Sequence, residues 1–196
     1  MATLIDLYER RVAGEIRRFK RVVVETTGLA DPAPIIHTMM QEPLVFNHYR
    51  LARVVTAVDA VNAMATFDRQ GEAIKQAAVA DALLVTKTDM ANDGEALSAL
   101  DARLRQLNPS GVRARCIAGA VDAAMLFSGG IYDPEGKTAD VEGWLAEENA
   151  ASNAAREHHH AIDVTRPDDG LFTYPLTRHA PLPPGALTPS IPMLAV

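Results

Sequence analysis

The stretch that most constrains the fold begins with three consecutive valines. Val22–Val24 are β-branched and uninterrupted by polar residues, which is typical of a strand buried on both faces of a parallel sheet. Glu25 follows directly, Gly28 comes three residues later, and Asp31-Pro32 supplies a helix start. Because ligands of open α/β sheets bind beyond the carboxyl ends of the strands, the pattern predicts an acid near Mg²⁺ or an attacking water, and a glycine N–H near a phosphate. The alternative is a surface glutamate and an ordinary turn glycine.

A second apolar stretch ends in a polar signature. Residues 82–85 read as a short strand, and Thr86-Lys87-Thr88-Asp89 follows it. This signature resembles the guanine-recognition motif of GTPases, usually Asn-Lys-x-Asp. Asp89 would accept hydrogen bonds from the N1–H and exocyclic amine of guanine, donors that adenine cannot offer as a pair. The Lys87 stem would lie along the base, and Thr86 stands where GTPases usually have an asparagine that makes a bracing hydrogen bond to the phosphate-side loop.

Together these segments resemble the CobW-type GTPases, relatives of the HypB and UreG metal-insertion proteins. The most specific part is Glu25–Pro32, and further matching segments follow in family order: residues 54–60, 76–82, 86–89, 107–109, 119–122 and 132–134. The resemblance implies a GTP-binding metallochaperone associated with zinc or cobalt, with Glu25 as a catalytic residue and Gly28, Thr86, Lys87 and Asp89 in nucleotide binding. The implied cofactors are GTP and Mg²⁺, with Zn²⁺ as a further candidate. The implied partners are a guanine nucleotide and a client metalloprotein.

Two family features are missing from the sequence. A GTPase of this kind has a glycine loop ending in Gly-Lys-Ser/Thr, and only 24 residues precede Glu25 here. Gly136-Lys137-Thr138 is interpreted as a chance match, because Gly130 is one residue too distant for the motif and acidic residues surround it. The single cysteine, Cys116, cannot form a cysteine-rich metal motif, and we expect it to be a small buried residue. We therefore expect a chain cut at both ends, whose enzymatic activity is undecided.

The alternation of strand and helix patterns predicts an α/β fold. We expect a partial P-loop NTPase-like parallel sheet with flanking helices, lacking the phosphate-loop strand, followed by the start of a small α+β C-terminal domain. The expected strands are 22–24, 51–58, 82–85 and 112–117, and the expected helices are 3–18, 32–40, 60–67, 72–80, 93–107 and 122–127. The predicted domains are a partial GTPase domain at 1–127, a mobile linker at 128–157, and the C-terminal domain from 158 to 196.

A histidine run opens the predicted C-terminal domain. On a strand, His158 and His160 would share one face, and imidazole suits zinc. A zinc site needs three or four ligands, and only His179 or Asp163 could add to this pair. The alternative is a solvated polar run at the entry to a strand.

Charge and hydropathy limit the classes of partner that we expect and indicate the compartment. Nineteen basic and twenty-five acidic residues give a net charge of −6, which disfavours nucleic acid and anionic membranes as partners. The amino terminus shows no signal-peptide pattern and no apolar run approaches the length of a membrane span, so we expect a cytoplasmic protein.

The sequence is consistent with two functions and disfavours a third. The first is a GTPase-coupled zinc or cobalt chaperone, incomplete in this chain. The second is a non-catalytic remnant or interaction module that keeps the fold without hydrolysing nucleotide. A dinucleotide-binding enzyme is disfavoured, because no Gly-x-Gly-x-x-Gly follows a predicted strand.

Overall fold

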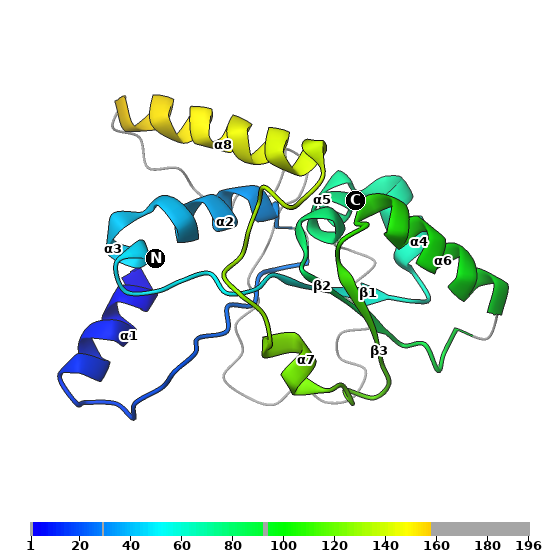
Figure 1. The fold of residues 1–196 in the computed structure, drawn as a ribbon, viewed down its shortest axis with the longest axis horizontal. Coiled ribbons are helices and arrows are strands. Elements are labelled where there is room, and N and C mark those ends of the chain that lie inside the picture. Colours follow the sequence, from blue (N-terminus) through cyan, green and yellow to red (C-terminus); the bar gives the residue numbers. More distant parts are fainter. Residues whose placement is uncertain (1, 29, 92–93, 158–196) are drawn as a thin grey trace, which may run out of the picture. The chain divides into compact units, whose positions relative to one another are not determined.

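Three parallel strands form the sheet that positions the predicted guanine motif (Figure 1). The structure is a computed structural model, and it describes residues 2–28, 30–91 and 94–157. The strands are β1 (Val55–Asp59), β2 (Ala82–Thr86) and β3 (Val112–Cys116), in the order β1-β2-β3. Their last residues, Asp59, Thr86 and Cys116, are ladder partners, so all three strands end at one edge.

Helices connect and flank these strands. They are α1 (Ala2–Val12), α2 (Pro32–Gln41), α3 (Pro43–Phe46), α4 (Ala63–Arg69), α5 (Gly71–Val79), α6 (Gly94–Leu107), α7 (Ala123–Phe127) and α8 (Ala139–Glu157). The start of α2 forms as the sequence predicts, with Asp31 accepting a hydrogen bond from the Ala33 N–H at 2.9 Å and Pro32 in the first turn. No helix among the described residues has the length and apolar character needed to cross a membrane.

Helix α5 lies between two apolar clusters. Ala77 and Ala80 face the first cluster, which also holds β1, α4, β2 and α6 through side chains such as Phe67, Leu83 and Leu104. The second cluster joins α5 to α2 and α8; its buried members are Ala33, Ile36, Ala78, Val79, Tyr132, Val141 and Leu145. The small residues of the Ala-Ala-Val-Ala stretch let other elements pack closely on both sides of this helix.

Asn108 fixes the turn from α6 into β3. Its side chain is 1% exposed, and its amide nitrogen donates to the Ala77 and Ala80 carbonyls at 2.9 and 2.7 Å. Its amide oxygen accepts from the Gly111 N–H at 2.7 Å. A Cβ on Gly111 would come within 2.6 Å of this side chain, so the position requires glycine. The contacts tie the start of β3 to the end of α5.

The predicted first strand is wrong for the described structure. Residues 22–24 are not in a strand and pair with none of the three described strands, and Val23 and Val24 are 75% and 53% exposed. A parallel strand is stabilised by its ladder and by burial of both faces, and three valines alone supply neither. The segment therefore runs as irregular chain between α1 and α2, and α1 itself ends at Val12, before the residue 18 that we predicted.

The predicted linker also differs from the structure. Residues 139–157 form α8, whose Val141 and Leu145 are buried against the second cluster. Trp144 packs on the same cluster, and the Lys75 ammonium lies 5.9 Å from its ring centroid. The interpretation as a mobile linker is therefore wrong for this part, while the three domain boundaries stay a prediction. The predicted C-terminal domain lies outside the described residues.

Candidate functional site

The predicted guanine motif lies at the carboxyl edge of the sheet. Thr86 is the last residue of β2, and residues 87–89 continue directly from it into a turn. The Thr86 carbonyl accepts from the Ala60 N–H at 3.0 Å, and its hydroxyl donates to the Val58 carbonyl at 3.3 Å. Both bonds tie the start of the motif to β1. The threonine that replaces the usual asparagine therefore braces the neighbouring strand in this structure.

Lys87 turns the chain back towards β1. Its φ of 57° lies in the left-handed region, which is uncommon for a residue with a side chain. The Met90 N–H donates to the Lys87 carbonyl at 3.0 Å and closes the turn. The Lys87 ammonium lies 2.8 Å from Oδ2 of Asp59, at the end of β1. This side chain is half exposed, as a wall for a bound base requires.

Asp59 is a member of the site that the sequence reasoning did not single out. Its carboxylate also accepts from the Asn62 side chain at 3.0 Å and from the Val61 N–H at 2.9 Å. The hydrogen bond from Lys87, with those from Asn62 and Val61, lowers the Asp59 pKa to about 2 against the opposing effect of burial. The available signal was an acid directly after the apolar run of residues 54–58, one strand away from the motif.

Asp89 carries the carboxylate that is predicted to accept from guanine. The residue is exposed, and no described residue donates a hydrogen bond to its carboxylate or forms an ion pair with it. The guanine N1–H and exocyclic amine donate side by side, so their acceptor needs both carboxylate oxygens available. The exposed Asp89 carboxylate, which no described residue engages, is compatible with this predicted role. The described residues thus fit a guanine base.

Glu25 and Gly28 lie in the irregular segment before α2. Glu25 is exposed and forms no ion pair or hydrogen bond with another described residue. The Gly28 carbonyl accepts from the Gln76 side chain at 3.0 Å, and a neighbouring Asp31–Lys75 ion pair of 2.5 Å also holds the segment to α5. Gly28 is exposed with open space around it. The described residues therefore form no phosphate cradle here, and they do not fit a bound triphosphate with Mg²⁺.

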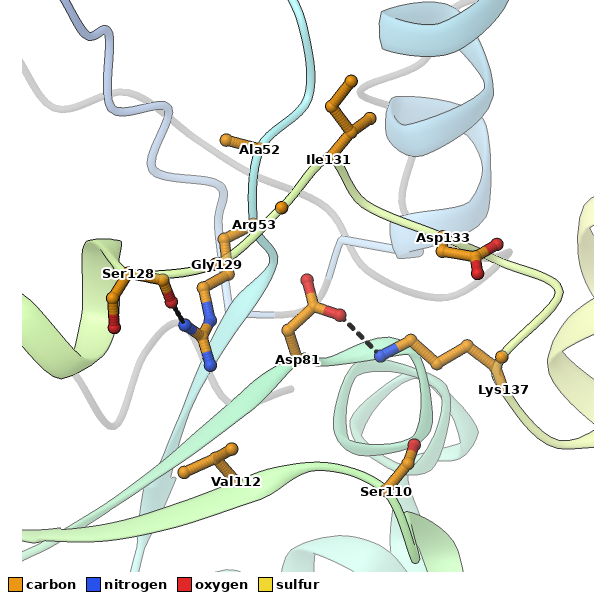
Figure 2. Close-up of a pocket in the computed structure, with 12 residues that line it drawn as sticks. Ala52, Arg53, Asp81, Ser110, Val112, Ser128, Gly129, Ile131, Asp133 and Lys137 are labelled. Carbon is orange, nitrogen blue, oxygen red and sulfur yellow. Dashed lines mark hydrogen bonds and ion pairs between the residues drawn. The ribbon is translucent and has the colours of Figure 1, made fainter.

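A hollow of about 340 Å³ lies at the opposite, amino-terminal edge of the sheet. Figure 2 shows Lys137 reaching Asp81, the residue before β2, while Arg53 binds the Ser128 carbonyl. The Lys137 side chain is only 6% exposed, and its ammonium is bonded to Oδ1 of Asp81 at 2.7 Å and the Ala80 carbonyl at 2.9 Å. This ammonium is already held by protein acceptors, which supports the interpretation of Gly136-Lys137-Thr138 as a chance match.

Metal ligands are not gathered among the described residues. No group of three or more His, Cys, Asp or Glu side chains in that part of the chain could hold a metal ion. Cys116 is buried at the end of β3, as expected for a small apolar residue. His158 and His160 lie outside the described residues, so the zinc prediction for them stays a prediction.

Comparisons with known proteins agree with these features. The family model described as "CobW/HypB/UreG, nucleotide-binding domain" matches residues 1–113. This chain belongs to the CobW/HypB/UreG family. The predicted family and the partial P-loop NTPase-like α/β fold are therefore confirmed.

Two curated relatives and one solved structure are similar to parts of the chain. The zinc chaperone YjiA of Escherichia coli (strain K12) is 34% identical over 155 residues, which cover 79% of this chain and 44% of YjiA. The zinc-regulated GTPase metalloprotein activator 1 of Schizosaccharomyces pombe is 32% identical over 92 residues, covering 46% of this chain and 22% of that protein. The crystal structure of the Zn(II)-bound YjiA GTPase from E. coli matches with a TM-score of 0.57 and 38% identity, covering 63% of this chain and 38% of that one. The chain thus spans less than half the length of these relatives.

Proposed function

We propose that this chain carries the guanine-recognition part of a GTP-binding protein that delivers zinc or cobalt to a client metalloprotein in the cytoplasm. Family membership supports the nucleotide class, and the names of the two curated relatives support the link to zinc. The chain spans under half of each relative. The proposal for this chain itself therefore centres on the base-recognition step.

The observation that carries the proposal is the exposed Asp89 carboxylate, which no described residue engages, two residues after Lys87, whose ammonium is paired with Asp59. Asp89 would accept from the guanine N1–H and amine, while the Lys87 methylenes would lie along the base plane. An adenine base would leave the desolvated carboxylate without its donors, at a cost of about 1–3 kcal/mol. That cost corresponds to roughly a five- to hundredfold preference for guanine.

The proposal also assigns residues to phosphate handling. Glu25 is proposed to position Mg²⁺ or the attacking water, and Gly28 to approach a phosphate, once both are held beside a phosphate-binding loop. The described residues lack such a loop, so we derive no hydrolytic step from this chain. His158 and His160 are proposed zinc ligands on the sequence pattern alone.

The competing function is an interaction module that keeps the fold without using nucleotide. The observation that favours it is the irregular, exposed course of residues 22–28, which leaves Glu25 and Gly28 apart from the sheet. The two functions differ in one measurable property, which is selective binding of guanine nucleotides.

Nucleotide-observed NMR with GDP and ADP tests the proposal. Because the phosphates are not cradled, we expect weak GDP binding, near millimolar, which corresponds to about 4 kcal/mol. GDP should broaden more than ADP, and Asp89→Ala should remove the difference. Asp68→Ala, which removes an exposed carboxylate on α4, is the matched control and should leave the preference intact. Equal broadening by both nucleotides, unchanged in Asp89→Ala, would favour the interaction module.

A further inference from the structure

We infer that Asp59 is a positioning residue for guanine recognition, which fixes the Lys87 side chain across the carboxyl edge of the sheet. The inference rests on the proposed function. It adds a residue from a different strand to the Thr-Lys-Thr-Asp motif.

The Asp59 carboxylate is held in one orientation by groups on its own turn. Oδ1 accepts from the Val61 N–H at 2.9 Å, and Oδ2 accepts from the Asn62 side chain at 3.0 Å. With both oxygens engaged by the β1–α4 connection, rotation of the carboxylate would break at least one of these bonds. Oδ2 also accepts a hydrogen bond from the Lys87 ammonium, whose nitrogen lies 2.8 Å from it. Asp59 is therefore a fixed acceptor for a side chain that is flexible by nature.

The backbone contacts around Lys87 are consistent with its ion pair to Asp59. Asp59 and Thr86 are ladder partners, and the Ala60 N–H to Thr86 carbonyl bond extends the contact one residue beyond the strands. Immediately after this bond Lys87 adopts its left-handed conformation. A non-glycine residue in this region is strained, and such strain persists where the surroundings compensate for it. Here the surroundings include the ion pair to Asp59 and the hydrogen bond from the Met90 N–H to the Lys87 carbonyl.

The ion pair with Asp59 affects the position of the Lys87 methylenes more than the charge of its ammonium. With the ammonium anchored on β1 and the Cα at the end of β2, the four methylenes must span the edge between these strands. A base whose polar edge meets Asp89 could then rest on a preformed apolar surface. Without the anchor, the stem would sample many rotamers and would have to be ordered on binding, which weakens affinity. Because the Lys87 side chain is 52% exposed before binding, we expect an effect of roughly three- to tenfold.

A double-mutant cycle on the full 196-residue chain tests this role. GDP and ADP affinities are measured by nucleotide-observed NMR for wild type, Asp59→Asn, Lys87→Met and the double variant. Asparagine keeps an acceptor for the Val61 N–H, while the ion pair and the hydrogen bond from the Asn62 side chain are lost; the Lys87→Met background separates these two effects. Asp101→Asn, which removes a carboxylate paired with Arg105 and Arg113 at α6, is the matched control.

The expected result has three parts. Asp59→Asn lowers GDP affinity roughly three- to tenfold and leaves ADP affinity nearly unchanged. The same substitution has no further effect in the Lys87→Met background, and Asp101→Asn changes neither affinity. A purely structural role for Asp59 would lower both nucleotide affinities and would persist without Lys87.

The outcomes separate this inference from the proposed function. If Asp89→Ala removes the guanine preference and Asp59→Asn does not reduce it, the inference is overturned and the proposed function stands. An effect of Asp59→Asn that persists in the Lys87→Met background also overturns the inference. If wild type shows no guanine preference, both are overturned.

Discussion

Asn108 joins two stretches of backbone, the end of α5 and the turn into β3, through one carboxamide. Its nitrogen serves two carbonyls at the end of α5, and its oxygen serves the Gly111 N–H. These groups are buried with it, so water cannot replace the side chain if it is removed. A single residue thus sets where β3 enters the sheet and, through the ladder, where its carboxyl end lies.

We expect Asn108→Ala to lower the free energy of unfolding by about 2–3 kcal/mol, because it leaves the Ala77 carbonyl and the Gly111 N–H without partners and takes one of two donors from the Ala80 carbonyl. Urea denaturation followed by circular dichroism measures the change. Asn47→Ala, at an exposed asparagine, is the control and should stay within about 0.5 kcal/mol of wild type. A loss no larger than that of the control would show that the Asn108 contacts are not formed.

Residue patterns located the guanine motif but not its acidic neighbour. Thr86, Lys87 and Asp89 are predictable, because an apolar strand followed by polar residues places them at the carboxyl edge. Asp59 is not predictable in the same way, since its role depends on the register between β1 and β2 and on the left-handed turn at Lys87. Such relations between strands are not encoded by spacing along the chain.

At the scale of elements, the alternation of strands and helices from residue 32 to residue 127 was readable from sequence. Periodicity and caps placed α2, α5, β2, α6 and β3 within a few residues of their bounds. Residues 22–24 have the composition of a strand, but a strand also requires a ladder partner, and sequence composition does not supply one. Helix α8 was missed because three apolar residues, Val141, Trp144 and Leu145, carry its packing in an otherwise polar and alanine-rich stretch.

Helix α8 gives a prediction at this scale. Leu145 is 8% exposed in the cluster shared with α2 and α5, so Leu145→Ala removes buried apolar surface and leaves a cavity. We expect a loss of about 2–3 kcal/mol in the free energy of unfolding, measured by urea denaturation.

The matched control is Glu147→Ala, two residues further along the same helix at an exposed position. It should change stability by no more than about 0.5 kcal/mol. If Leu145→Ala behaved like this control, α8 would not pack on the body, and the original interpretation of residues 128–157 as a linker would be restored.

At the scale of the whole molecule, the residues predicted to recognise the base and those predicted to face the phosphates lie in different surroundings. Lys87 and Asp89, the residues proposed to bind the base, follow the carboxyl end of β2 and are exposed. The described residues that family resemblance assigns to the phosphate side, Glu25 and Gly28, are exposed and outside the sheet. We expect the binding energy from the base alone to be small, because phosphate contacts and the charge on Mg²⁺ supply much of the affinity for a nucleotide.

This separation predicts GTP turnover indistinguishable from background for the 196-residue chain. Phosphoryl transfer depends on donors that hold the phosphates and neutralise developing charge. Lys137, the lysine of the Gly-Lys-Thr sequence, is buried against Asp81 at the opposite edge of the sheet. Phosphate release with Mg²⁺ and GTP in excess measures the rate, with Glu25→Gln as the paired variant. Both proteins should match the enzyme-free blank. Turnover by wild type that Glu25→Gln abolishes would mean that residues 22–28 join the sheet and assemble a phosphate site when nucleotide is present.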